Sequence, residues 1–153
     1  MSTIFLGFRY CVLPLGFFLS QHKYVTGLLH KLYLYTLKLV CTLHVSRTTL
    51  SLTNGELLAD PSKYSSMVGA LQYLTMARLD IAYDIQVVSQ FMHAPYTSHL
   101  IAVKRIFRYL QGTAEHGLFF KSSSRLDRVV AVCDADWVGG PDSCRTTTGF
   151  AIF

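Results

Sequence analysis

The chain has 153 residues, which allows one ordinary domain or two small ones. Apolar residues make up 51% of the chain and charged residues only 15%, so a hydrophobic core can form and some apolar surface should stay exposed, as in a piece of a larger protein. Lys and Arg outnumber Asp and Glu by 14 to 9, and the resulting net charge of +5 permits contact with nucleic acid without requiring it.

The cysteines exclude a zinc site of the usual spacing. They lie far apart, at Cys11, Cys41, Cys133 and Cys144, and no two form a Cys-x-x-Cys pair. We expect reduced thiols and an intracellular protein, cytoplasmic or nuclear.

Residues 1–19 are strongly apolar and could be a signal peptide or a membrane anchor. Arg9 interrupts the run, no basic residue precedes it, and a spanning helix needs about 20 clean apolar residues. We therefore favour two short strands, residues 4–12 and 16–20, joined by a turn. Membrane association stays an alternative.

The next segment predicts a helix over residues 21–33, with Ser20 as its N-cap and apolar residues along one side. Residues 34–45 are apolar and β-branched enough for a short strand or an extended segment. Residues 46–63 are rich in Ser and Thr, include the turn dipeptide Asn54-Gly55, and predict a linker.

Three helices are predicted between Tyr64 and Gly112. Pro95 separates the second from the third, Thr97 or Ser98 is the expected N-cap of the third, and Gly112 is its expected end. Apolar residues recur at helical spacing in each of them: Met67, Leu71 and Leu74; Ile81, Ile85, Val88 and Met92; Leu100, Val103, Ile106, Phe107 and Leu110. Helices of this length need one another's apolar faces to be stable.

The third helix carries a basic ridge, formed by Lys104, Arg105 and Arg108. At 100° per residue these side chains fall within one wedge about 100° wide, opposite the apolar stripe. Such a ridge can follow a phosphate backbone, and it can equally be a solvated polar face. The residues alone favour the solvated face.

The end of the chain predicts a β-hairpin. Residues 118–121 form a short strand and 122–124 a Ser-rich joint, followed by β-rich runs at 128–133 and 146–153 with a Gly-Pro turn between them. The first run ends in Asp134 and Asp136, which by themselves suggest solvated turn residues. His93 and His99 have no Cys or carboxylate spaced to complete a metal site. The predicted fold class is α+β: short N-terminal strands, three central helices and a C-terminal hairpin.

Several motifs resemble the reverse transcriptase of Ty1/copia-type long-terminal-repeat retrotransposons of plants. They read FLG, FLSQHKY, VGALQYL, RLDIAY, VVSQFMHAP, SHLIAVKRIFRYLQGT and GLFFK, and the hairpin, CDADWVGG with RTTTGF, resembles the opening of that family's ribonuclease H domain. The family usually has Pro where this chain has Leu79. Because Asp80 can still favour a helix start, we expect the helix to survive.

The resemblance implies a division of the chain into four parts. Residues 1–45 would be the end of the polymerase palm and the following helix, 46–63 a linker, 64–113 the thumb and connection, and 117–153 the start of an incomplete ribonuclease H-like domain. In the intact family enzyme Asp134 would bind catalytic Mg²⁺. The other acidic ligands would lie downstream, and no adjacent Asp-Asp pair supplies a polymerase centre. We therefore expect a vestigial Asp134, no cofactor and no catalysis in this chain alone.

Three hypotheses for function follow. The first is a fragment of a Pol polyprotein that binds RNA/DNA duplex weakly through the basic ridge and Lys121, with the missing polymerase and ribonuclease H portions as its other partners and no membrane contact. The second is a host structural or interaction protein that reuses the helical core. The third is a small membrane-associated protein that uses residues 1–19.

Overall fold

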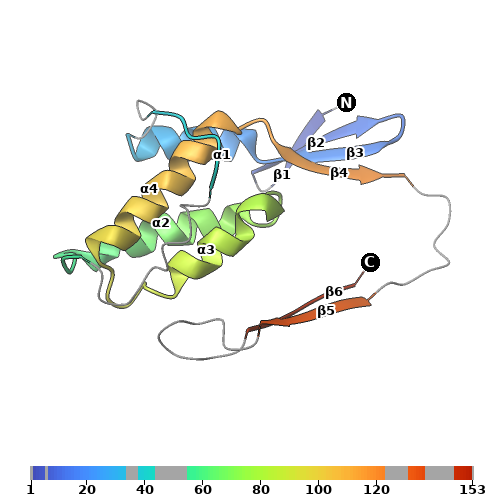
Figure 1. Cartoon of the computed structure of the whole chain (residues 1–153). Helices are drawn as coiled ribbons and strands as arrows, with labels where there is room; N and C mark the ends of the chain where they lie inside the picture. Colours follow the sequence, from blue (N-terminus) through green and yellow to red (C-terminus); the bar gives the residue numbers. More distant parts are fainter. Residues whose placement is uncertain are drawn as a thin grey trace. The chain divides into compact units, whose positions relative to one another are not determined.

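A computed structural model describes residues 2–5, 7–33, 38–43, 55–122, 131–136 and 147–152, with side chains within 7–33, 38–43 and 55–122. These residues form the α+β fold that the sequence predicts (Figure 1). The chain divides into two compact units, Met1–Lys121 and Ser122–Phe153.

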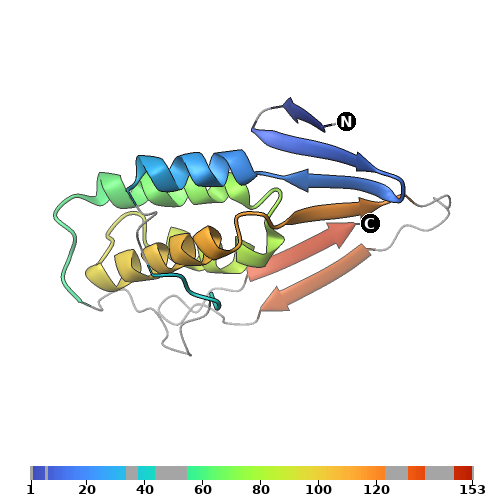
Figure 2. The same ribbon diagram turned by 90° about the horizontal axis from the view of Figure 1, so that it is seen from above.

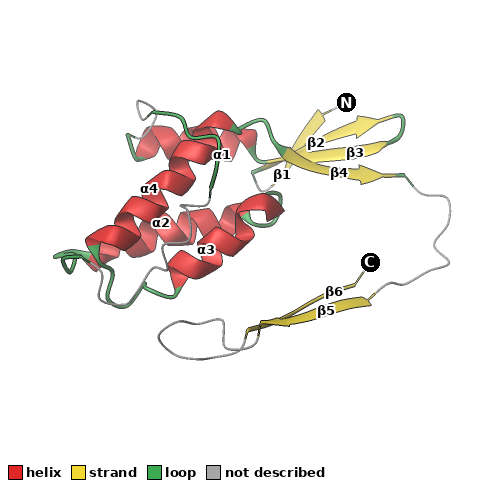
Figure 3. Ribbon diagram, viewed as in Figure 1, coloured by secondary structure: helices red, strands yellow, loops and turns green. Residues whose placement is uncertain are grey.

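The first unit contains an antiparallel sheet and a helical bundle. Its strands are β1 (Ser2–Phe5), β2 (Phe8–Leu13), β3 (Gly16–Ser20) and β4 (Gly117–Lys121). Its helices are α1 (His22–Lys31), α2 (Pro61–Leu74), the 3₁₀ turn η1 (Leu79–Ile81), α3 (Ala82–Ser89) and α4 (Thr97–Gly112). Figures 2 and 3 show the strands gathered at one end of the helices, where β3 leads into α1 and α4 leads into β4.

The sheet has the strand order β1-β2-β3-β4. The single strand predicted over residues 4–12 is in fact two, because Gly7 adopts φ 78, a left-handed conformation that turns the chain between them. Val12 is paired with Phe17, and Phe17 with Phe120, so side chains from three strands share one face. The rings of Phe17 and Phe120 stack with their centroids 4.6 Å apart.

The pairing of β3 with β4 places the boundary between the two units after Lys121, and not before residue 117 as predicted. The sequence assigned residues 117–153 together to a second domain, but Gly117–Lys121 completes the sheet of the first unit. The close approach of these strands requires glycine at both ends of the pairing. A Cβ atom on Gly16 would overlap the carbonyl oxygen of Phe120, and one on Gly117 would overlap that of Leu19.

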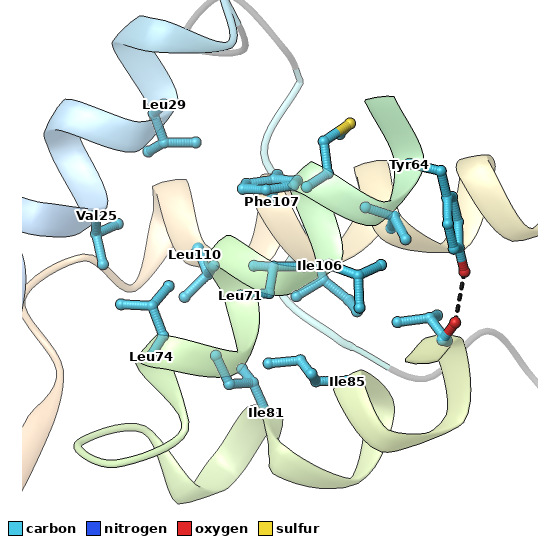
Figure 4. Packing of buried hydrophobic residues seen from close by; sticks show 14 residues of the cluster. Val25, Leu29, Tyr64, Leu71, Leu74, Ile81, Ile85, Ile106, Phe107 and Leu110 are labelled. Atoms are coloured by element: carbon cyan, nitrogen blue, oxygen red, sulfur yellow. Dashed lines mark hydrogen bonds between the residues drawn. The ribbon is translucent and has the colours of Figure 1, made fainter. Parts of the chain in front are cut away.

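The core lies among the helices, at the stripes that the sequence predicts (Figure 4). It is formed by buried side chains of α1, α2, η1, α3 and α4: Val25, Leu29, Tyr64, Met67, Val68, Leu71, Leu74, Ile81, Ile85, Val88, Val103, Ile106, Phe107 and Leu110. Met92 and Leu100 pack against this core while partly exposed. The hydroxyl of Tyr64, itself fully buried, donates to the carbonyl of Val88 at 2.6 Å and ties α2 to the end of α3.

The starts of the helices differ from the predictions. α2 begins at Pro61, inside the predicted 46–63 linker, because the Asp60 carboxylate accepts from the amide of Ser62 and Pro fits the first helical turn. The second predicted helix survives without the family's Pro, as a 3₁₀ turn at exposed Leu79 followed by α3.

The N-cap of α4 is Tyr96, so the prediction of Thr97 or Ser98 was wrong by one or two residues. The amide of Tyr96 donates to Nδ1 of His99 at 3.0 Å, so the His99 ring takes the place of the Glu or Gln side chain at the third helical position of a capping box. Gly112 ends the helix as predicted.

The sequence predicted a short strand or an extended segment over residues 34–45. Residues 38–43 run without regular secondary structure, so this described part contains no strand; residues 34–37, 44 and 45 lie outside the described residues. Most of the predicted linker, residues 46–54, lies outside them as well. No helix among the described residues is long and apolar enough to cross a membrane.

The second unit contains the predicted C-terminal hairpin. β5 (Ala131–Asp136) pairs antiparallel with β6 (Thr147–Ile152), and the register places Cys133 opposite Phe150 and Asp134 opposite Gly149. The predicted turn between the two strands lies outside the described residues.

Candidate nucleic-acid interface

The predicted basic ridge lies on α4, away from the core. Lys104 is exposed, and Arg105 and Arg108 are half-buried, while Val103, Ile106 and Phe107 on the same helix are buried. The helical periodicity therefore placed these residues correctly relative to the core.

The structure also gives both arginines protein partners. Arg105 donates from Nε to the carbonyl of Leu43 at 2.9 Å and from Nη2 to the hydroxyl of Thr42 at 3.0 Å. Arg108 donates from Nε to the carbonyl of Lys38 at 2.9 Å. Three hydrogen bonds thus hold the 38–43 segment against α4, and contact of these residues with nucleic acid stays a prediction.

Lys121, the additional basic residue named for duplex contact, is exposed at the end of β4. Its strand partner is Gly16 of β3, so it belongs to the sheet rather than to α4. No pattern in the sequence predicts where Lys121 lies relative to the ridge.

Asp134 and Asp136 both lie within β5, where their backbone partners are Gly149 and Thr147. The strand continues through Asp136, so these residues are not in the turn. Their side chains lie outside the described part of the structure. Where side chains are described, no three His, Cys, Asp or Glu residues come together in a way that could hold a metal ion. The Mg²⁺ role of Asp134 therefore stays an expectation from the resemblance.

The two histidines near Pro95 have different surroundings. His99 is fully buried, and its ring stacks on Phe91 with centroids 3.9 Å apart. Its Nδ1 accepts the Tyr96 amide, so His99 supports the start of α4. His93 is exposed.

The most strongly connected polar group was not predicted. Arg78 is only 2% exposed, and it forms a two-pronged ion pair with Asp80, at 2.9 Å from Nε to Oδ1 and 2.7 Å from Nη2 to Oδ2. It also donates from Nη1 to the carbonyl of Thr113 at 2.8 Å and from Nη2 to that residue's hydroxyl at 2.7 Å. Arg78 therefore ties the start of η1 to Thr113, the residue that follows α4.

Tyr109 completes this cluster from α4. Its hydroxyl donates to Asp80 at 3.0 Å, and its ring lies 5.7 Å from the Arg78 guanidinium carbon. Burial opposes ionisation of Asp80, but the hydrogen bonds and charge of Arg78, with the Tyr109 hydroxyl, outweigh it and lower the pKa of that carboxyl. Burial and the bond to Asp80 raise the pKa of Tyr109.

An open cleft of about 480 Å³ lies beside the cluster, with Phe18, Leu118 and Glu115 among its lining residues. The Arg78 donors bond to Asp80 and Thr113, so this ion pair serves to join helices. The sequence signal that could have revealed it is the Arg-x-Asp spacing shortly after the apolar stripe of α2.

Comparison with known proteins identifies the family. The chain is 43% identical over 149 residues to a retrovirus-related Pol polyprotein from transposon RE1 of Arabidopsis thaliana, and 40% identical over 149 residues to that from transposon RE2 of the same plant. Each match covers 97% of this chain and 10% of the relative. An uncharacterized mitochondrial protein of Arabidopsis thaliana is 40% identical over the same length, which is 61% of that protein.

No protein-family model and no solved structure matches the chain. The plant matches run through almost all of its length, from the N-terminal strands to the hairpin, and the chain spans about a tenth of the Pol polyproteins that it matches. The chain belongs to the family of retrotransposon Pol polyproteins.

Proposed function

We propose that the chain is the part of a Ty1/copia-type Pol polyprotein that joins the reverse transcriptase to the ribonuclease H domain. The observation that carries the proposal is the match to the RE1 polyprotein at 43% identity through 97% of this chain. The two compact units support it, because a sheet-and-helix unit is followed by a separate hairpin in the order that the sequence motifs imply.

In this proposal the chain has no catalytic activity of its own. Phosphodiester cleavage by two metal ions needs several carboxylates around ions about 4 Å apart, and the first strand of the hairpin supplies only Asp134 and Asp136. Asp134 would serve as a Mg²⁺ ligand only within an intact ribonuclease H domain. The sequence has no adjacent Asp-Asp pair for a polymerase centre.

The test of this part is a pair of activity assays on the purified chain. A fluorescent RNA–DNA hybrid is incubated with Mg²⁺ and analysed for cleavage, and a primed RNA template with nucleotides is analysed for extension. We expect neither product. Cleavage by the native chain that is lost in the Asp134→Asn variant would refute the proposal.

The chain's remaining activity, in this proposal, is weak binding of an RNA/DNA duplex through Lys104, Arg105 and Arg108. Support comes from the exposure of Lys104, from the position of all three on α4 opposite the core, and from the charge of the first unit, in which eleven Lys and Arg stand against five Asp and Glu. Fluorescence anisotropy of a labelled hybrid measures the affinity. A variant with the three residues changed to Gln should bind at least tenfold more weakly, and Lys63→Gln, an exposed charge on α2, serves as the matched control.

The exposed apolar residues of the sheet fit a second kind of partner, the missing portions of the polyprotein. Val12 is 68% exposed, Phe17 40% and Phe120 42%, and these three side chains share one face of the sheet. In the alternative of a host interaction protein, the same face would bind an unrelated protein. A complex recovered from cells, resistant to nuclease and free of Pol sequences, would favour that alternative.

A further inference from the structure

We infer that the 38–43 segment covers two residues of the basic ridge, Arg105 and Arg108, and competes with nucleic acid for their guanidinium groups. This inference rests on the proposed duplex binding and adds a regulatory device to it. The segment would reduce the affinity of the chain for a duplex, and a duplex would displace the segment.

The geometry of Arg105 carries the argument. Its Nε and Nη2 atoms form one edge of the guanidinium, the edge that binds two oxygens of a phosphate side by side. In this structure a carbonyl oxygen of Leu43 and a hydroxyl oxygen of Thr42 occupy that edge, at 2.9 and 3.0 Å. The segment thus presents two oxygens where a phosphate would present its own.

Arg108 is engaged in the same way one turn further along α4. Its Nε donates to the carbonyl of Lys38 at 2.9 Å, so the segment contacts both arginines, at its start and at its end. Lys104, which precedes Arg105 on the same helix, is exposed. A duplex could therefore approach Lys104 first and gain both arginines only as the segment leaves.

The charges favour exchange over permanent closure. The three acceptors in the segment are neutral. A phosphate adds the attraction of an opposite charge and can form a bidentate pair with a guanidinium. Few apolar contacts hold the segment in place. Leu43 packs partly buried against the core and Leu39 lies beside Gly112, but Leu39 is 56% exposed, and Lys38, Cys41 and Thr42 are exposed as well.

The first experiment loosens the segment and measures duplex affinity. The variant with Leu39→Ser and Leu43→Ser removes the two apolar anchors and leaves both arginines in place. If the segment covers the arginines nine-tenths of the time, this variant should bind a labelled RNA–DNA hybrid about tenfold more tightly. Circular dichroism checks that its helices are intact, and Tyr33→Ser, an exposed residue outside the segment, is the control.

The second experiment keeps the native segment and watches it directly. Cys41 is exposed and lies within the segment, so it can carry a nitroxide spin label once Cys11, Cys133 and Cys144 are changed to Ser. Addition of the hybrid should sharpen the spectrum as the segment becomes mobile. The control is the same spin-labelled protein with Arg105→Gln and Arg108→Gln in addition. The same hybrid is added to it, and its spectrum should not change.

Three results are distinguishable. Tighter binding by the loosened variant together with a sharpened spectrum supports the inference. Equal affinity of native and loosened proteins, with weaker binding by the arginine variant, overturns the inference but leaves duplex binding standing. No binding by any of these proteins overturns duplex binding and, with it, the competition.

Discussion

Replacement of Arg78 by Met should destabilise the first unit more than any other change of a charged residue described here. The side chain is almost fully buried, and it makes four hydrogen bonds, two to Asp80 and two to Thr113. Met fills much of the same space but supplies no donor. The Asp80 carboxylate would keep the Tyr109 hydroxyl and its own backbone amide as partners but lose both guanidinium bonds, and the Thr113 carbonyl would lose its guanidinium donor.

Removal of one partner of a buried ion pair costs about 3–5 kcal/mol, because the remaining charge stays unpaired in a poor solvent. The Asp80 side chain is 37% exposed and can be hydrated in part, so we expect about 2–3 kcal/mol. With a urea m-value of about 1–3 kcal/mol/M, this loss lowers the unfolding midpoint by roughly 1 M or more.

Circular dichroism at 222 nm is the suitable probe, because all the described helices lie within the first unit, whereas the single tryptophan, Trp137, does not. The series consists of Arg78→Met, Asp80→Asn, the double variant, and Lys63→Met as an exposed control. We expect a coupling energy of about 1–3 kcal/mol between the two positions. A loss below about 0.5 kcal/mol for Arg78→Met, or strictly additive effects, would refute the assigned role of this ion pair.

Three further predictions concern single side chains. The pKa of Asp80 is lower in the folded chain than in the unfolded chain, so on acidification the unfolded chain binds a proton first. The stability that ionised Asp80 contributes is therefore complete above the ordinary carboxyl pKa of 3.8 and is lost as pH falls through the lower pKa of the folded state. The difference in unfolding free energy between native protein and Asp80→Asn should accordingly shrink below pH 4, and a difference that is constant with pH would contradict this. Tyr64→Phe removes a buried hydrogen bond and should cost about 0.5–1.5 kcal/mol, while Tyr33→Phe, at a residue 79% exposed, should cost nothing measurable by urea unfolding. Gly27→Ala, in α1 with no atom near the new methyl group, should raise the free energy of unfolding by about 0.5–1 kcal/mol, whereas Gly16→Ala should lower it, because its Cβ meets the Phe120 backbone. Equal effects of the two alanines would show that the sheet does not hold β3 and β4 as closely as described.

The helical part of the fold could be predicted because its information is local. Leu71, Ile85 and Ile106 recur with their neighbours at helical spacing, and burial follows that spacing directly. The hairpin was predictable for a similar reason, since two β-rich runs flank a Gly-Pro turn and resemble a known motif.

The pairing of β3 with β4 was not predictable in this way. Phe17 and Phe120 lie about a hundred residues apart in the chain, and nothing in the pattern of either strand names its partner. Chain order suggested that residues 117–121 belong with the following hairpin. The glycines at 16 and 117 were the only local signs of a close backbone approach.

The candidate interface was predicted in position but not in its contacts. Helical geometry placed Arg105 and Arg108 opposite the core. Their partners are mostly backbone carbonyls, and because every residue has one, a sequence cannot indicate which carbonyl accepts the bond. Arg78 was missed for the opposite reason. Arginine is rarely buried, and only the structure shows that Asp80 and Thr113 satisfy its donors.

The salt dependence of duplex binding tests the central functional claim most directly. If Lys104, Arg105 and Arg108 each neutralise one phosphate, the logarithm of the association constant should fall with the logarithm of salt concentration with a slope of about −2.7, which is about a forty-fold loss of affinity between 50 and 200 mM. The variant with all three residues changed to Gln should lose most of that slope, and Lys63→Gln should keep it. A native affinity that does not change with salt, or the same slope in the native protein and the triple variant, would contradict the account of α4 as a nucleic-acid interface.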